Sequence, residues 1–152
     1  MKTYLDTSVL IASVSPEVET EAALAWLERH PNADHLISDW TLVEVASAIA
    51  LKERSQQLTM NQARIVNEIV DSWVRDSLEV LPIHRTVFHS ASRLLAQSGT
   101  RLRAGDALHL AIAREEGATL VTLDRTLANE ASVISLPVDV PGASSWQEAD
   151  DI

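Results

Sequence analysis

Residues 105–124 read GDALHLAIAREEGATLVTLD, and this segment sets the expected fold class. Its Ala- and Leu-rich first half predicts a helix over residues 105–116, which Gly117 ends. Its second half, residues 119–123, is an apolar run with β-branched residues, which is typical of a buried strand. A helix that leads directly into a buried strand is the repeating unit of proteins with a parallel sheet, so an α/β fold is expected.

The same alternation extends along the rest of the chain. The other predicted strands are residues 2–5, 35–38, 78–82 and 133–136. The other predicted helical segments are residues 8–13, 17–30, 42–54, 59–76, 85–97 and 125–131. Strands that alternate with helices imply a parallel sheet covered by helices on both faces. No internal repeat or linker interrupts the pattern, so residues 1–152 are expected to form a single domain.

Composition narrows the class of protein. The chain has 152 residues, of which 46% are apolar and 22% charged, as in a folded domain rather than a disordered chain. It contains no cysteine, which excludes a disulfide scaffold, a thiolate zinc site and a thiol nucleophile, and suits a reducing compartment. The sequence after Met1 lacks the apolar run of about 7–15 residues of a signal peptide, and no stretch approaches the roughly 18–20 residues of a membrane span. A cytoplasmic protein without membrane contact is expected.

The net charge is −10, from 22 acidic and 12 basic residues. A protein that held nucleic acid by charge alone would be basic, because neutralisation of phosphates supplies most of the affinity. The chain is therefore a poor candidate for a passive nucleic-acid binder. An acidic protein can still act on phosphodiesters when clustered carboxylates hold divalent cations, which reverse the local charge.

Four acidic side chains are expected near one edge of the predicted sheet. Asp6 and Asp124 directly follow predicted strands, and Glu44 lies on the second turn of the helix after another strand. Asp106 opens the helix before residues 119–123, so the topology places it less directly. The carboxyl ends of parallel strands share one edge, and ligands bind in the crevice outside that edge.

Each of these acids also has a structural explanation. Asp6 and Asp124 are suited to cap the helices that follow them, and Asp106 can complement a helix dipole. Glu44 stands three residues after Thr41, which is the spacing of a capping box. Converging carboxylates, however, repel one another unless cations lie between them. Clustered oxygen ligands suit Mg²⁺ or Mn²⁺, which can lower the pKa of a bound water and steady the leaving oxygen of a phosphodiester.

The segments that carry these acids resemble the sequence motifs of PIN domains. Residues 4–11, YLDTSVLI, are similar to the opening motif, an apolar strand that runs into Asp-Thr/Ser-Ser/Asn. Residues 38–48, which hold Glu44, resemble the second motif. Residues 103–111, RAGDALHLA, resemble the third, and residues 120–124, LVTLD, resemble the Thr-x-Asp motif. The four motifs occur in the family's order and cover nearly the whole chain.

The resemblance implies a three-layer α/β/α sandwich and an endoribonuclease site that binds Mg²⁺ or Mn²⁺. The implied catalytic and metal-binding residues, at the four acidic positions of the family, are Asp6, Glu44, Asp106 and Asp124. Thr7 or Ser8 would support Asp6, and Thr122 would orient the site by hydrogen bonding. No further acid follows Asp124 by one turn, a departure that bears on how tightly a second metal is held.

Short members of this family are commonly VapC-type toxins of toxin–antitoxin pairs. The resemblance therefore implies an RNA substrate, a homodimer and a cognate antitoxin laid across the active site. Arg101 and Arg103 flank Asp106 and are candidates to contact RNA phosphates, with solvated loop charges as an equal alternative. His109 lies three residues after Asp106 on one helical face, but its apolar neighbours favour a packed core histidine over a role near the substrate.

The tryptophans divide by their surroundings in the sequence. Trp26 and Trp73 fall on apolar helical faces and are expected in the core. Trp40 is close to Glu44 and is the tryptophan we expect near the site, where it could stack a base. Trp146 lies in a loop-like tail.

Two other functions fit parts of the pattern. Haloacid-dehalogenase-like phosphatases also place an aspartate after their first strand, but they use a second aspartate two residues on as acid and base, and this chain has Ser8 there. A non-enzymatic acidic interaction module, whose four acids are helix caps, is the other alternative. Binding of Mg²⁺ or Mn²⁺ discriminates it, because caps scattered over a surface do not bind a divalent ion specifically.

Overall fold

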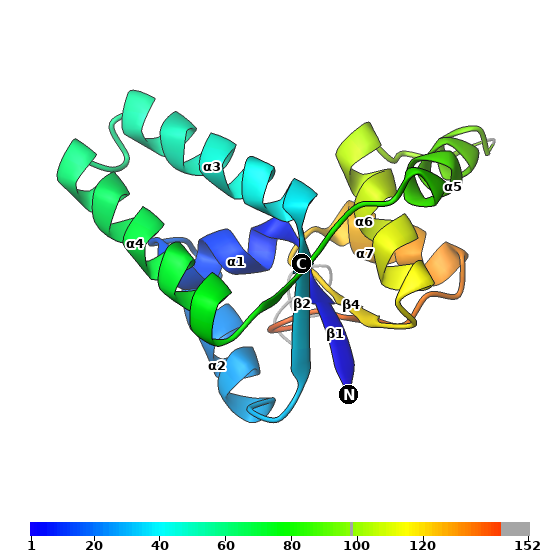
Figure 1. The fold of residues 1–152 in the computed structure, drawn as a ribbon, viewed down its shortest axis with the longest axis horizontal. Helices are drawn as coiled ribbons and strands as arrows, with labels where there is room; N and C mark the ends of the chain where they lie inside the picture. Colours follow the sequence, from blue (N-terminus) through cyan, green and yellow to red (C-terminus); the bar gives the residue numbers. More distant parts are fainter. Residues whose placement is uncertain (98, 144–152) are drawn as a thin grey trace, which may run out of the picture.

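The computed structural model describes residues 1–97 and 99–143, and five strands in those residues form one parallel sheet (Figure 1). The strands are β1 (Lys2–Leu5), β2 (Asp34–Ser38), β3 (Glu79–Leu81), β4 (Thr119–Val121) and β5 (Val138–Asp139). Their order across the sheet is β3-β2-β1-β4-β5, and every neighbouring pair is parallel. The predicted α/β class with a parallel sheet is confirmed. Trp146 lies outside the described residues.

Seven helices in the described residues cover the two faces of the sheet (Figure 1). They are α1 (Thr7–Val14), α2 (Thr20–Arg29), α3 (Asp39–Arg54), α4 (Met60–Asp76), α5 (Arg85–Leu95), α6 (Ala104–Glu115) and α7 (Arg125–Val133). Helices α1 to α4 pack on one face and α5 to α7 on the other, which gives the expected three layers. In this part of the chain no helix combines the length and apolar character that crossing a membrane requires.

Side chains alternate between the two faces along the central strands. Tyr4 and Leu120 belong to the core formed with α5, α6 and α7, whereas Leu5 and Val121 belong to the core formed with α1 to α4. All four side chains are fully buried. Because both faces of the sheet are covered, the strands are apolar at consecutive positions, as buried parallel strands require.

The prediction of a last strand over residues 133–136 is wrong. Val133 is the final residue of α7, and Ser135 adopts a φ of 58°. The backbone N–H of Leu136 then donates to the carbonyl of Ala131 at 2.9 Å and closes the helix end. Strand β5 begins only at Val138, so the apolar run belongs to the end of an amphipathic helix and the turn after it.

Strand β4 ends at Val121, two residues before the predicted end. The backbone N–H of Leu123 donates to Ser8 Oγ at 2.9 Å, and that of Asp124 donates to Thr122 Oγ1 at 3.0 Å, so neither pairs with a neighbouring strand. Gly117 ends α6 as predicted, with a φ of 61° that a residue with a Cβ rarely adopts.

The order of the strands reverses beside β1. The chain continues from β1 through β2 to β3 on one side, and then returns as β4 on the other side of β1. Parallel α/β sheets form their ligand crevice at this switch point, outside the carboxyl ends of the strands. Asp6 follows β1, and Thr122 and Asp124 follow β4, so these residues lie at that crevice.

Candidate active site

Asp6 is the most enclosed acid of the site, with 4% of its surface exposed. Its Oδ1 accepts hydrogen bonds from Ser8 Oγ (2.5 Å) and from the backbone N–H of Val9 (3.3 Å), and its Oδ2 accepts one from Thr122 Oγ1 (2.7 Å). Burial raises the pKa of Asp6, while the charge of His109 and these hydrogen bonds act in the opposite direction. The carboxylate is thus held in one orientation at the end of the central strand.

Thr122 connects Asp6 to the segment that carries Asp124. Its hydroxyl donates to Asp6 and accepts the backbone N–H of Asp124. Ser8 makes a second connection, because its hydroxyl donates to Asp6 and accepts the backbone N–H of Leu123. Of the three supporting residues expected from the sequence, Ser8 and Thr122 therefore contact Asp6, whereas Thr7 contacts Glu44 instead.

Glu44 extends from the second turn of α3 and is half-buried. The alternative that it closes a capping box with Thr41 is wrong, because the box at this helix start is formed by Ser38 and Thr41. Glu44 Oε2 instead accepts hydrogen bonds from Thr7 Oγ1 and from His109 Nε2, the latter at 2.6 Å. Burial is the largest single influence and by itself would raise the pKa of Glu44. The hydrogen bonds from His109 and Thr7 and the charge of His109 together outweigh it, so the pKa of Glu44 is lowered.

His109 is buried, as a core histidine would be, with 3% of its surface exposed. It nevertheless contacts the site, because its Nε2 meets Glu44 and its Nδ1 lies 2.9 Å from the hydroxyl of Tyr4. The sequence interpretation missed this contact. A usable signal was present in Tyr4, since a tyrosine in a buried strand needs a partner for its hydroxyl.

Asp106 and Asp124 line a cavity of about 320 Å³ together with Arg101, Arg103 and Thr126. Asp106 Oδ2 accepts the backbone N–H of Arg103 at 3.0 Å, and Asp124 Oδ1 accepts that of Leu127 at 3.0 Å. Asp124 is therefore the N-cap of α7, whereas Asp106, in the first turn of α6, accepts the backbone N–H of that helix's N-cap residue. The two arginines expected near the substrate stand at the same cavity as two of the four acids.

In the described structure Asp6 and Asp124 are N-caps, and Asp106 takes part in the capping box at the start of α6. Capping does not exclude a metal-binding role, since an ionised carboxylate has about four lone-pair sites and a cap uses one of them. Glu44 has no such structural duty in α3. Its position in the site therefore calls for an explanation other than capping.

The donor chemistry of these acids fits a hard divalent cation. Carboxylate oxygens, in a chain without cysteine, are the ligands of Mg²⁺ and Mn²⁺ rather than of thiolate-bound metals. Within residues 1–97 and 99–143, however, no three acidic or histidine side chains already form one ligand cluster. Each carboxylate is instead turned to a protein donor, as expected for like charges that repel one another.

Gly105 permits the close approach of α6 to α3. A Cβ at this position would lie 2.8 Å from Glu44 Oε1 and 3.2 Å from Trp40 Nε1. Trp40 is half-buried, as a residue at the edge of the site would be, and its indole nitrogen lies on the same side of Gly105 as Glu44 Oε1. Trp26 is in the core as expected, where its indole donates to Asp139 Oδ2 at 2.7 Å.

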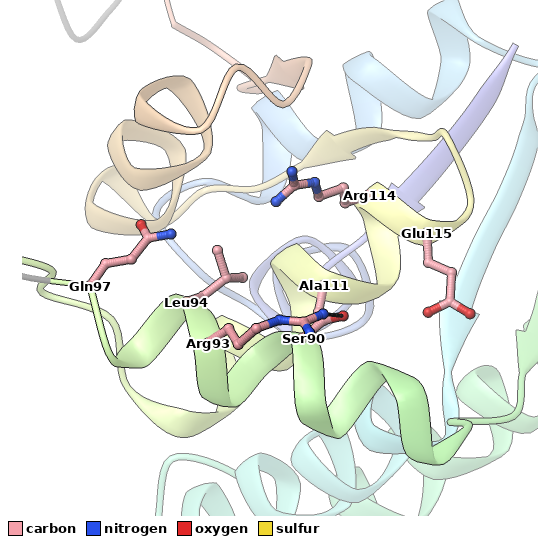
Figure 2. Close-up of a pocket in the computed structure, with 7 residues that line it drawn as sticks. All are labelled: Ser90, Arg93, Leu94, Gln97, Ala111, Arg114 and Glu115. Carbon is pink, nitrogen blue, oxygen red and sulfur yellow. Dashed lines mark hydrogen bonds between the residues drawn. The ribbon is translucent and has the colours of Figure 1, made fainter.

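A separate cavity of about 460 Å³ lies between α5 and α6 (Figure 2). Arg93 and Arg114 line it, and Arg93 donates to Ser90 Oγ at 3.3 Å. None of the acids described above borders this cavity. Its arginines are useful as matched controls for Arg101 and Arg103.

The fold defines a class, an α/β protein whose parallel sheet has a switch point beside β1, with Asp6 and Asp124 after the two strands that meet there. The PIN domain family matches residues 3–131 of this chain. Ribonuclease VapC35 of Mycobacterium tuberculosis is 30% identical over 146 residues, which cover 91% of this chain and 96% of that protein. The chain belongs to the PIN-domain family.

Solved structures of toxin–antitoxin proteins share the fold. A chain in the crystal structure of VapBC2 from Rickettsia felis, bound to a promoter DNA fragment, superposes with a TM-score of 0.68 at 20% identity, covering 92% of this chain and 98% of that one. VapC20 of Mycobacterium tuberculosis, a toxin that cleaves the sarcin–ricin loop, superposes with a TM-score of 0.67 at 17% identity, covering 84% and 93%. At these identities the likeness concerns the fold alone.

Proposed function

We propose that this chain is a divalent-metal-dependent endoribonuclease, the toxin of a VapC-type toxin–antitoxin pair. Its membership of the PIN-domain family and its 30% identity to a ribonuclease over nearly the whole chain support this function. The observation that carries the proposal is Asp6, a buried carboxylate fixed by Ser8 and Thr122 at the switch point of the sheet. Its place at the end of the central strand, where parallel sheets bind their ligands, supports Asp6 as a metal ligand.

The four acids, Asp6, Glu44, Asp106 and Asp124, would hold Mg²⁺ or Mn²⁺. When bound, the ion would lower the pKa of a water and stabilise the oxygen that leaves the phosphodiester. In the chain itself, Thr122 and Ser8 hold Asp6, and Thr7 and His109 hold Glu44, so both carboxylates are oriented before any ligand arrives. Such orientation reduces the reorganisation that binding requires.

Arg101 and Arg103 would bind the phosphates that flank the cleaved bond. They border the cavity that Asp106 and Asp124 also line, and their charge offsets the repulsion between an acidic crevice and a polyanion. Trp40, half-buried beside Glu44, is the aromatic side chain that we propose meets a base.

The biological part of the proposal concerns location and assembly. We place the chain in the cytoplasm, as a single domain over residues 1–152, with a cognate antitoxin and with a second copy of itself as partners. Large apolar side chains stay exposed on α3 and α4, among them Val43, Leu51 and Met60, and exposed apolar surface supports an interface. Sedimentation of the purified chain at several concentrations tests the homodimer.

The test of the activity uses purified protein, RNA and controlled Mn²⁺. The wild type should cleave RNA, lose cleavage when a chelator removes the metal, and bind Mn²⁺ in a calorimetric titration. Glu44→Gln should lose most cleavage and bind Mn²⁺ more weakly, because an amide is a poorer metal ligand than a carboxylate. Folded wild-type protein that neither binds Mn²⁺ nor cleaves RNA would favour the acidic interaction module. Hydrolysis of phosphomonoesters instead of RNA would favour the phosphatase alternative.

A further inference from the structure

A continuous chain of hydrogen bonds runs beneath the acidic crevice and joins four elements. It begins at Ser38 Oγ and Thr41 Oγ1, which lie 2.8 Å and 3.2 Å from the hydroxyl of Tyr4. That hydroxyl lies 2.9 Å from His109 Nδ1, and His109 Nε2 lies 2.6 Å from Glu44 Oε2. Strands β1 and β2 and helices α3 and α6 each contribute to the chain.

The chemistry of these groups sets the direction of the bond to Glu44. An ionised carboxylate only accepts hydrogen bonds, so His109 Nε2 must carry the proton. Its other nitrogen, Nδ1, can then accept from Tyr4 or, in a charged ring, donate to it, because the hydroxyl both donates and accepts. Ser38 and Thr41 accommodate either arrangement. The bond from Nε2–H to Glu44 is therefore kept in both states of the ring.

We propose that His109 is a positioning residue, whose Nε2–H orients the Glu44 carboxylate within the acidic crevice while the Tyr4 hydroxyl fixes the imidazole. The proposal rests on the function proposed above, since the role of Glu44 as a metal ligand is part of that function. His109 also lies one turn after Asp106 on α6. Its bond to Glu44 therefore also holds α6, which carries Asp106, near α3, which carries Glu44.

A purely structural histidine would not require this arrangement. The position is 3% exposed, and an apolar side chain would fill it without the cost of burying a polar ring. Here both ring nitrogens have partners, and one partner is an acid of the site rather than a backbone group. Partners that orient a metal ligand typically affect metal affinity or activity by about 10–100-fold.

The experiment compares His109→Leu with His109→Gln in the full chain. Glutamine can place an N–H near the position of Nε2, whereas leucine fills the volume without a donor. We expect His109→Leu to lower Mn²⁺ affinity and the kcat of RNA cleavage by about 10–100-fold, and His109→Gln to recover most of this loss. His109→Leu should nevertheless be more stable than His109→Gln, because a leucine side chain costs less to bury than a glutamine side chain. His89→Leu, an exposed position on α5, is the control that should change neither.

Tyr4→Phe gives an independent reading if His109→Leu does not fold. It keeps the ring of the core residue and removes only the hydroxyl that meets Nδ1, so it should reduce Mn²⁺ affinity with little change in KM for RNA. The inference is overturned if His109→Leu and His109→Gln have equal Mn²⁺ affinity, or if activity follows stability across the variants. Nitrogen-15 NMR of the metal-free wild type separates this proposal from the proposed ribonuclease function. A protonated His109 Nε2 whose signal changes in Glu44→Gln supports the contact even when no RNA is cleaved. An unprotonated Nε2 overturns the contact.

Discussion

Asp6 combines two properties that oppose each other in a folded protein, deep burial and a carboxyl group. Ionisation is disfavoured by burial, and Ser8 and Thr122 offset this only in part, so the pKa of Asp6 stays raised. The folded state then binds this proton more tightly than the unfolded state does. The resulting contribution to stability is present at low pH and is lost as the pH rises through the folded pKa.

Asp6→Asn should therefore abolish RNA cleavage without lowering stability. Asparagine cannot ionise, so the loss of stability with rising pH should shrink, and asparagine still caps α1 well. Urea titrations between pH 5 and pH 8, with Asp71→Asn on the exposed side of α4 as the control, measure this change. Full RNA cleavage by folded Asp6→Asn would show that Asp6 serves only as a cap, because asparagine fills that role too.

Adding one methyl group at Gly105 gives a second test, which concerns the position of the Glu44 carboxylate. In Gly105→Ala the new Cβ would meet Glu44 Oε1 at 2.8 Å, and the flexible carboxylate, rather than the backbone, would move. We expect weaker Mn²⁺ binding and slower cleavage, although alanine in a helix normally adds about 0.5–1 kcal/mol of stability over glycine.

A double-mutant cycle with Glu44→Ala isolates this contact. Removing the Glu44 side chain removes the clash, so the stabilising effect of Gly105→Ala should be larger in the Glu44→Ala background than in the wild type. Equal effects in the two backgrounds would mean that Gly105 and Glu44 are independent.

The residues of the site differ in how far the sequence could predict them. Asp6 directly follows β1 and Asp124 comes three residues after β4, so the direction of the chain is enough to predict both near the same edge of the sheet. His109 is surrounded in sequence by Leu108 and Leu110, and its partner Glu44 is 65 residues away. That contact depends on the packing of α6 against α3, which no local pattern contains.

At the scale of elements, the segment before α6 brings positive charge to an acidic site. Arg101→Ala and Arg103→Ala should each weaken RNA binding and reduce the salt dependence of binding by about one unit of log–log slope. Binding of single-stranded RNA to the Asp6→Asn background, measured over a range of salt concentrations, avoids cleavage of the probe.

Arg93→Ala is the matched control for this pair, because it removes the same charge from the cavity between α5 and α6 (Figure 2). A protein that attracts RNA only through its overall charge would respond equally to all three substitutions. A local phosphate site predicts a response at residues 101 and 103 alone.

Element boundaries show where sequence patterns lose information. The long amphipathic helices were predicted within a few residues, because their apolar faces repeat over several turns. Strand β5 has two residues, too few for any periodicity, and the apolar pair Val133 and Ile134 lies at the end of α7 instead. Ser135 with its positive φ is the residue that ends this helix, and serine is not a strong signal for that conformation.

At the scale of the whole molecule, the sequence predicted a parallel sheet but contained no direct information on its strand order. The order follows from the insertion of β4 beside β1, on the side opposite to β2. The placement of β4 beside β1 brings Thr122 and Asp124 near Asp6, and it also creates the crevice. The net charge of −10 favours the approach of cations to the protein as a whole.

The proposed antitoxin should therefore inhibit by delivering a basic side chain to the acids of the site. An Arg or Lys of the partner can occupy the place of a cation among Asp6, Glu44, Asp106 and Asp124, with a charge-assisted bond to a carboxylate. Replacing that residue with Ala should weaken inhibition, and raising the Mn²⁺ concentration should reverse the inhibition by wild-type partner. Cleavage assays at fixed toxin and varied partner and Mn²⁺ measure both effects.

Mass action fixes the sign of this competition. A metal that binds the free toxin and not the complex raises the apparent Kd of the partner in proportion to one plus the ratio of metal concentration to metal Kd. Glu44→Gln removes one negative charge from the site and should weaken the binding of both the metal and the partner. A partner bound elsewhere on the surface would keep its affinity. Partner binding that neither Mn²⁺ nor Glu44→Gln weakens would place the proposed antitoxin away from the acids, and the block would then be steric rather than electrostatic.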